Sequence, residues 1–265
     1  MIGLSTKIKG KPVRLEVQQF GEAEGSDQGK PDVVLIHGTG ADHSIWKPQI
    51  DILSARGYRS FLPELRGHGL TDEPGELTDI NVHIQDLLDT LEGCPVRFPA
   101  VFVGHSLGAI IAISLAQQQP QLFEQILAVS LPGRVPRLVS TLFSLVLCAP
   151  FEMLRGTLLH RSLPYRERLL IETERHSLEQ IVEHFAEVNF VDHPPKLACP
   201  VHLAVGRFDV VAPYIYVERI QRSMPNSSLR IFEWAGHNCM DDQPGQFNRW
   251  FLEKLERHSR QLTAV

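Results

Sequence analysis

The chain has 265 residues, of which 43% are hydrophobic and 22% are charged, and its formal net charge is −5. This is an ordinary globular composition, long enough for one elaborated domain or two small ones. Acidic and basic residues are interspersed along the chain without a basic cluster. The charge pattern therefore argues against a nucleic-acid partner and offers no attraction to anionic lipid.

Targeting and redox signals favour a cytoplasmic protein. No apolar stretch of signal-peptide length follows the charged residues near the start. The longest apolar tract, residues 138–154, contains three hydroxyl residues, Pro150 and Glu152, so it is a poor membrane span. The cysteines form no CxxC pair and are expected to be reduced thiols: Cys94, Cys148, Cys199 and Cys239.

Apolar segments and helical periodicities alternate along the chain. Residues 6–9 and 13–20, separated by Gly10-Lys11-Pro12, are typical of a hairpin at a sheet edge. Five apolar runs fit strands that are covered on both faces: residues 33–36, 58–62, 100–104, 125–131 and 201–206. Helical spacing recurs at residues 80–91, at 107–116 and from Pro244 onward. This alternation predicts a mostly parallel α/β sheet.

One interval interrupts the alternation. Between Leu131 and Val201 about 65 residues look helical or irregular, far more than a strand-to-helix connection needs. We expect residues 134–196 to form a helical cap over the carboxyl edge of the sheet, where open α/β sheets bind ligands. Residues 1–133 and 197–265 would then form the core domain.

The segment Gly104-His105-Ser106-Leu107-Gly108 lies between an apolar strand and an apolar helix, which is the context that a G-x-S-x-G nucleophile motif requires. Glycines at both ends let the backbone turn sharply. The turn would lift the side chain of Ser106 out of the sheet, next to a helix N-terminus that favours developing negative charge.

A serine hydroxyl needs a base, and the base needs an orienting acid. Asp209 follows the apolar strand 201–206, and His237 follows the run LRIFEW, so the two residues come in the expected order at strand ends. An oxyanion would need two N–H donors. The sequence predicts those of Leu107, directly after the nucleophile, and of Thr39, in the loop after strand 33–36.

Together these segments resemble the α/β-hydrolase superfamily, in particular its serine-triad, esterase-like members with a helical cap. The resemblance covers nearly the whole chain and rests on HGTG (37–40), RGHG (66–69), GHSLG (104–108), GRFD with Pro213 (206–213) and GH (236–237). It implies a twisted sheet of about eight strands flanked by helices. It also implies that Ser106 is the nucleophile, His237 the base and Asp209 its orienter, while His68 is structural.

Several residues beside the nucleophile are expected to line the substrate: Gly38, His105, Trp46, Leu142 and Phe143. Trp46 also fits a common packing position near the pocket, and we take it as a core residue there. The apolar residues of 138–147 indicate a lipophilic acyl or alcohol group, unless they form the core of the cap itself. Neither a metal-binding cluster nor a cofactor fingerprint is present, and the predicted partner is a small, apolar ester.

Alternatives to ester hydrolysis remain open at this stage. Carbon–carbon bond hydrolases that resemble this fold often carry tryptophan directly after the catalytic histidine, and Asn238 at that position disfavours this alternative. A lyase or hydrolase acting on an acidic metabolite would use arginines of the cap, since guanidinium groups suit carboxylates: Arg134, Arg137, Arg155, Arg161, Arg166 and Arg168. A receptor-like protein that binds a hydrophobic signal with little turnover is a third possibility.

Overall fold

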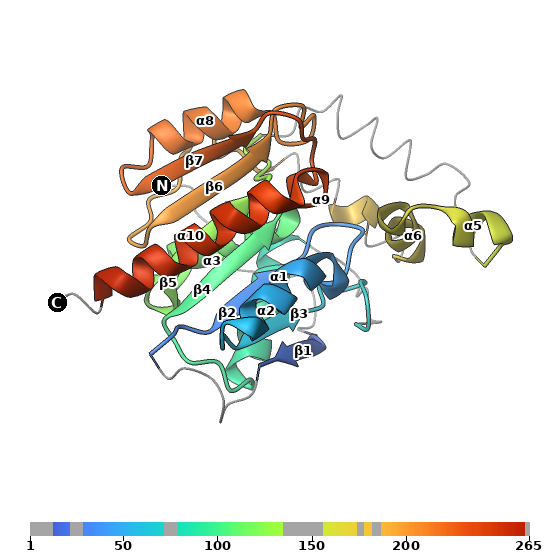
Figure 1. Cartoon of the computed structure of the whole chain (residues 1–265), viewed down its shortest axis with the longest axis horizontal. Coiled ribbons are helices and arrows are strands. Elements are labelled where there is room, and N and C mark those ends of the chain that lie inside the picture. The colour runs from blue at the N-terminus through green and yellow to red at the C-terminus, as the bar shows by residue number, and fades with distance from the viewer. Residues whose placement is uncertain are drawn as a thin grey trace.

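A computed structural model of the chain describes residues 13–21, 29–71, 79–134, 156–173, 178–181 and 187–262 (Figure 1). Within these residues seven strands form one sheet in the order β1-β3-β2-β4-β5-β6-β7. β1 runs antiparallel to β3, and all other neighbours are parallel. The strands are β1 (Val17–Phe20), β2 (Val33–Ile36), β3 (Ser60–Pro63), β4 (Ala100–His105), β5 (Phe123–Val129), β6 (Val201–Gly206) and β7 (Ser227–Phe232).

The mostly parallel α/β sheet predicted from the sequence is confirmed. The described residues supply seven of the roughly eight strands expected from the resemblance, and the hairpin strand predicted at 6–9 lies outside them. Several predicted bounds are wrong: the strands predicted at 13–20, 58–62, 100–104 and 125–131 are observed at Val17–Phe20, Ser60–Pro63, Ala100–His105 and Phe123–Val129. β3 begins at Ser60 because the N–H of Tyr58 caps the preceding helix at Leu53. β5 ends at Val129 because Ser130 adopts a φ of 51°.

Helices cover both faces of the sheet. They are η1 (His43–Trp46), α1 (Lys47–Ala55), α2 (Ile80–Glu92), α3 (Leu107–Gln118), η2 (Pro120–Leu122), α5 (Leu158–Ser162), α6 (Tyr165–Glu172), α8 (Tyr214–Arg222), α9 (Cys239–Asp242) and α10 (Pro244–Leu262). Successive residues of a strand point to opposite faces. Val34 and Ile36 accordingly pack with α2, α3 and α8, whereas Val33 and Leu35 pack with α1 and α10. β2, β3 and β4 are buried on both sides, whereas the edge strands β1 and β7 are partly exposed.

The helix predicted at 80–91 is confirmed as α2. The carboxylate of Asp79 accepts a hydrogen bond of 2.8 Å from the N–H of Val82 and so caps the first turn. Ile84, Leu87 and Leu91 recur at helical spacing and are buried against the sheet. The C-terminal helix predicted from Pro244 is confirmed as α10.

Parts of the predicted cap lie in the described residues. α5 and α6 project from the end of the core at which β6 and β7 finish (Figure 1). A single β-bridge between Arg134 and Asn189 closes the base of this segment. Leu142 and Phe143, predicted to line the substrate, lie outside the described residues, and the domain boundaries at 134 and 196 stay predictions.

Candidate active site

The backbone turns sharply between β4 and α3. Ser106 joins the two elements with φ 52° and ψ −112°, a conformation that non-glycine residues rarely adopt. A Cβ on Gly104 would collide with the carbonyl group of Gly108, and a Cβ on Gly108 would collide with the carbonyl group of Ile36. Both glycines are therefore required by close backbone approach, while the serine between them carries the strain.

Three side chains from distant parts of the chain meet at this turn. The hydroxyl of Ser106 donates to Nε2 of His237 over 3.0 Å. Nδ1 of His237 donates to the carboxylate of Asp209 over 2.9 and 3.0 Å. Ser106 and Asp209 are almost fully buried, whereas about a quarter of the His237 side chain is exposed. The structure thus brings together all three residues that the sequence singled out.

Asp209 is held in its ionised form. Its Oδ1 accepts hydrogen bonds from the N–H groups of Val211 (2.9 Å) and Ala212 (2.7 Å). Burial pushes the pKa of Asp209 upward, but the charge of His237 and hydrogen bonds from His237, Ala212 and Ser130 outweigh burial, so its pKa lies below the ordinary value. Asp209 therefore presents a fixed negative charge to the imidazole.

The backbone of His237 is fixed from below by two donors. Ser130 Oγ donates to the carbonyl oxygen of His237 over 2.7 Å, and Nε2 of His105 donates to the same oxygen over 3.1 Å. Ser130 was not singled out from the sequence. Its signal would have been a hydroxyl residue closing an apolar strand at the carboxyl edge of the sheet.

His105 supports the site from within the core. It is buried, and burial followed by the charges of His237 and Arg166 holds its pKa well below 6.5. The ring is therefore neutral, with its Nε2 proton directed to the backbone of His237. The structure thus places His105 behind the nucleophile and not on an open, substrate-lining surface. Trp46 is likewise fully buried, within the core beneath α1 and α10.

The loop after β2 lies against the nucleophile. A Cβ on Gly38 would be 3.1 Å from Cβ of Ser106 and 2.7 Å from Nδ1 of His105, so a larger residue would push the loop away. Thr39 follows, and its hydroxyl is buried without a hydrogen-bond partner. On the other side of Ser106, Leu107 is the first residue of α3, where N–H groups lack a partner within the helix. The two predicted N–H donors thus lie on the segments that flank Ser106.

Histidines fasten this loop to the one after β3. Nε2 of His37 accepts from the N–H of Leu65 over 2.9 Å, and Nε2 of His68 accepts from the N–H of Gly40 over 3.0 Å. Nδ1 of His68 donates to the carbonyl of Arg66 over 2.8 Å. His68 therefore has the structural role predicted for it.

Comparison with known proteins identifies the family. The sequence model of the Alpha/beta hydrolase family matches residues 33–250, which is more than half of the chain. The chain belongs to the alpha/beta hydrolase family. This assignment agrees with the mostly parallel sheet and with the order in which the serine, aspartate and histidine occur.

Relatives of this hydrolase carry different names. Rv2715 of Mycobacterium tuberculosis, itself named as uncharacterised, is 28% identical over 250 residues, 82% of this chain and 73% of its own length. RutD of Enterobacter cloacae, whose name proposes a carbamate hydrolase, is 26% identical over 248 residues, 86% of this chain and 92% of its own.

Solved esterases share the fold of this hydrolase. The esterase EaEST from Exiguobacterium antarcticum aligns with a TM-score of 0.78 at 19% identity, over 91% of this chain and 95% of its own. A thermophilic esterase from Thermogutta terrifontis, solved with malate bound, aligns at 0.74 and 20% identity, over 92% and 94%. At these identities the similarity establishes the fold only, and the substrate has to be inferred from the residues of the site.

A buried carboxyl group that the sequence did not reveal lies beside the loop after β2 of the hydrolase. Glu64 follows β3, and its side chain is fully buried. It accepts from the N–H of His43 over 3.3 Å and hydrogen-bonds the ring of the same residue. Burial raises the pKa of Glu64 to about 7, although its hydrogen bonds to His43 oppose that effect. A proton on Glu64 is therefore exchanged near neutral pH.

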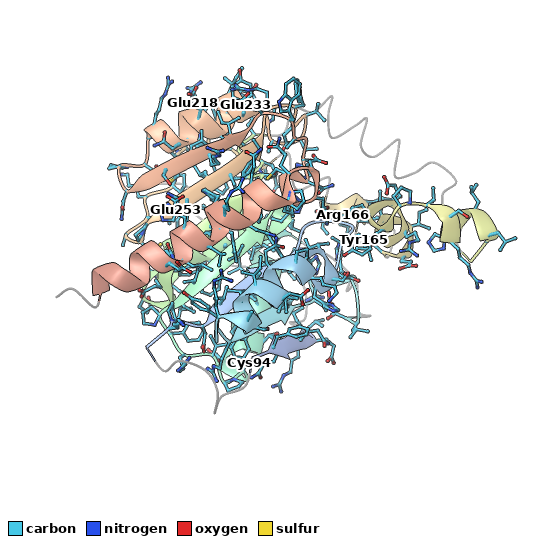
Figure 2. The ribbon with its side chains drawn as sticks, viewed as in Figure 1. Cys94, Tyr165, Arg166, Glu218, Glu233 and Glu253 are labelled. Atoms are coloured by element: carbon cyan, nitrogen blue, oxygen red, sulfur yellow. The ribbon has the colours of Figure 1, made fainter. Side chains whose placement is uncertain are left out.

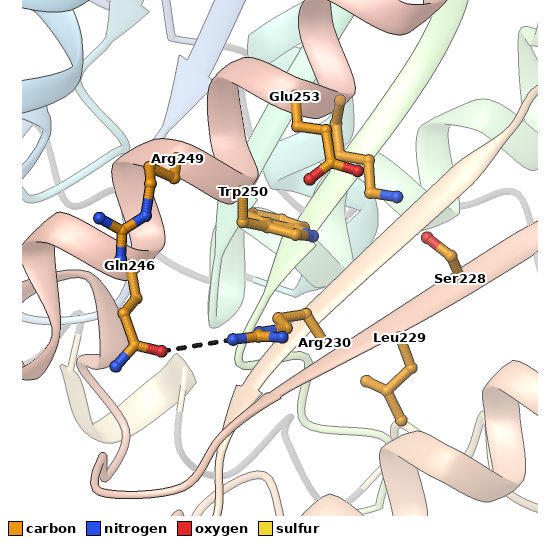
Figure 3. A pocket seen from close by; sticks show the side chains of 8 residues that line it. Ser228, Leu229, Arg230, Gln246, Arg249, Trp250 and Glu253 are labelled. Carbon is orange, nitrogen blue, oxygen red and sulfur yellow. Dashed lines mark hydrogen bonds between the residues drawn. The ribbon is translucent and has the colours of Figure 1, made fainter.

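A hollow of about 360 Å³ lies elsewhere on the hydrolase, between β7 and α10 (Figure 3). Arg230 donates across it to Gln246 over 3.3 Å, and Arg249 and Glu253 add charges of opposite sign. Its hydroxyl group, that of Ser228, is paired with Nδ1 of His202 on the neighbouring strand. None of the triad residues lines this hollow, so we assign it no part in the chemistry.

Two further observations concern the described residues. None of their helices is both long and apolar enough to cross a membrane. They also contain no group of three or more histidine, cysteine, aspartate or glutamate side chains that could hold a metal ion.

Proposed function

We propose that this hydrolase cleaves a carboxylic ester through an acyl-enzyme intermediate on Ser106. The observation that carries the proposal is the continuous path of hydrogen bonds from Ser106 Oγ through the imidazole of His237 to the carboxylate of Asp209, with heavy-atom distances of 3.0 and 2.9 Å. Such a path lets one proton leave the hydroxyl as its oxygen attacks.

In the first half-reaction Ser106 Oγ forms a bond to the ester carbon, and its proton passes to Nε2 of His237. The carbonyl oxygen takes up the electron pair of the C=O bond and is stabilised by the N–H groups of Leu107 and Thr39. The tetrahedral intermediate then expels the alcohol oxygen, which receives the proton from His237. In the second half-reaction water attacks the acyl-enzyme with His237 as base, releasing the acid and restoring Ser106.

The ester is proposed to be a small molecule with an apolar acyl or alcohol group. Leu170 of α6 supports this idea, because its side chain lies against Gly40 and gives the oxyanion loop an apolar cover. Esterases among the structural neighbours are consistent with ester chemistry.

The proposed location is the cytoplasm. It agrees with the free thiols of three described cysteines: Cys94, Cys199 and Cys239.

The test is hydrolysis of 4-nitrophenyl esters from acetate upward in chain length. We expect turnover by the wild-type protein, and a loss of at least about 1,000-fold in kcat for Ser106→Ala, because the nucleophile is removed. A fluorophosphonate probe should label the wild type and leave the variant unlabelled. If the wild type hydrolyses no ester of any chain length, the esterase proposal is wrong even though the fold holds.

A further inference from the structure

The first turn of helix α6 in the cap segment contacts η1, which follows the loop after β2, and α9, which follows the loop that carries His237. On one side the hydroxyl of Tyr165 and that of Ser44, in η1 after the HGTG loop, lie 2.6 Å apart. On the other side Nε of Arg166 donates to Oδ2 of Asp241 over 2.6 Å. Asp241 belongs to α9, four residues after His237. The first turn of α6 is therefore tied both to η1 and to α9.

One N–H donor of the Arg166 guanidinium group has no acceptor. Its side chain is only 19% exposed, and its guanidinium group lies 5.8 Å from the ring centre of Tyr165. Nη2 is buried and has no hydrogen-bond partner. Figure 2 shows Arg166 and Tyr165 at the end of α6 that lies next to the core. A buried guanidinium N–H without an acceptor is costly, so the site calls for a ligand that supplies one.

The positive charge of Arg166 reaches the catalytic centre. It contributes to the lowered pKa of His105, the residue directly before the nucleophile. Other arginines of the cap segment are placed differently: Arg134 pairs with Asp192 on the surface, and Arg161 is exposed. Arg168 has a buried, unpartnered Nε, but no contact to α9 is described for it. Among the cap arginines that the structure describes, Arg166 is thus the one that is anchored to α9, near the triad.

We propose that Arg166 binds a carboxylate of the substrate, so that this hydrolase prefers esters carrying a free carboxylate, such as monoesters of dicarboxylic acids. The inference rests on the proposed function and names its substrate class. Asp241 already balances one positive charge, which favours a singly charged carboxylate over a phosphate dianion. The apolar cover from Leu170 suits the hydrocarbon part of the same substrate.

The experiment compares 4-nitrophenyl hemiglutarate, which carries a carboxylate, with 4-nitrophenyl hexanoate, which is similar in length and neutral. The readout is the ratio of their kcat/KM values. We expect the wild type to favour the hemiglutarate, and Arg166→Gln to lower the ratio by about tenfold or more, because a charge-assisted hydrogen bond is lost. A second pair, 4-acetoxybenzoate and 4-methylphenyl acetate, places the carboxylate on the alcohol side instead.

Two control variants separate binding from tethering. Asp241→Asn weakens the tether and keeps the guanidinium group, whose charge is then no longer balanced by Asp241, so the ratio should stay the same or rise but should not fall. Arg168→Gln removes the same charge from the same helix and should also leave the ratio unchanged. The proposal is overturned if the wild type favours neither carboxylate-bearing ester, if Arg166→Gln lowers both members of each pair equally, or if Arg168→Gln has the same effect as Arg166→Gln.

A binding measurement keeps this inference apart from the esterase proposal. Calorimetry with glutarate and the Ser106→Ala protein requires no turnover. We expect binding that Arg166→Gln weakens about tenfold or more and that methyl phosphate does not reproduce. No glutarate binding, or binding that Arg166→Gln leaves unchanged, would overturn the carboxylate site whether or not any ester is hydrolysed.

Discussion

The carbonyl oxygen of His237 accepts hydrogen bonds from Ser130 and His105, and these fix the backbone from which the catalytic imidazole projects. An imidazole in a loop after a strand would otherwise sample several orientations. Its two ring nitrogens can face Asp209 and Ser106 together only in one of them. Ser130 and His105 thus act as positioning residues: they hold His237 in place through its backbone and do not contact the reacting atoms through these hydrogen bonds.

We predict that Ser130→Ala lowers kcat for a 4-nitrophenyl ester by about five- to tenfold and changes KM little. One of two donors to the His237 carbonyl is lost, at a cost of about 1 kcal/mol, and the base spends less time aligned with Ser106. Steady-state kinetics on the purified variant measures the split between kcat and KM. Ser60→Ala is the matched control, since the buried hydroxyl of Ser60 has no partner. Equal losses of kcat in both variants would contradict the positioning role.

Among the elements, those with a regular apolar pattern could be predicted and those that depend on distant contacts could not. β2 and β6 match their predicted bounds because short, mainly apolar runs are typical of strands in a sheet that is covered on both faces. The end of β5 could not be predicted, since Ser130 turns there to meet His237, 107 residues away in sequence. The contact between Arg166 and Asp241, which lie 75 residues apart, could not be predicted from the sequence either.

The same reasoning applies to the site. Ser106, Asp209 and His237 could be singled out because each follows a recognisable strand in a fixed order. Glu64 could not, because its burial depends on the way the loops after β2 and β3 pack together. Motifs along the chain indicate the reacting groups, whereas the groups that hold them emerge from packing.

The loop after β2 gives a prediction at the element scale. Gly38→Ala adds a Cβ that would lie 2.7 Å from Nδ1 of His105, so the loop must move away from the nucleophile. If Thr39 donates to the oxyanion, kcat should fall by about 100-fold while His237 and Asp209 stay in place. Steady-state ester hydrolysis measures the loss. Gly245→Ala is the control, because nothing lies within 4 Å of the added Cβ. If kcat is unchanged in the Gly38→Ala protein, the loop after β2 does not contribute to the oxyanion site.

At the scale of the whole molecule, buried titratable groups couple the stability of the fold to pH. His37 and His105 are neutral in the core, with pKa values that burial holds well below 6.5, so they destabilise the fold as the pH falls through the range in which the unfolded histidines become protonated. Glu64 acts in the opposite direction. Burial raises its pKa from 4.5 to about 7, so the folded protein keeps a proton that the unfolded chain has already released. Its contribution to stability is complete below pH 4.5 and is lost as the pH rises through 7.

Glu64→Gln isolates this contribution, because the histidine effects are common to the wild type and the variant. We expect the difference in the free energy of unfolding, wild type minus variant, to fall by on the order of 2 kcal/mol between pH 5 and pH 8. Over this pH range the folded wild type releases the proton of Glu64 and loses the stabilisation that this proton gives, whereas the glutamine side chain does not titrate. Urea unfolding at several pH values measures the difference, with the exposed Glu92→Gln as the control whose curve should run parallel to the wild type. A parallel curve for Glu64→Gln would mean that the carboxyl group of Glu64 stays ionised in the folded protein over this pH range.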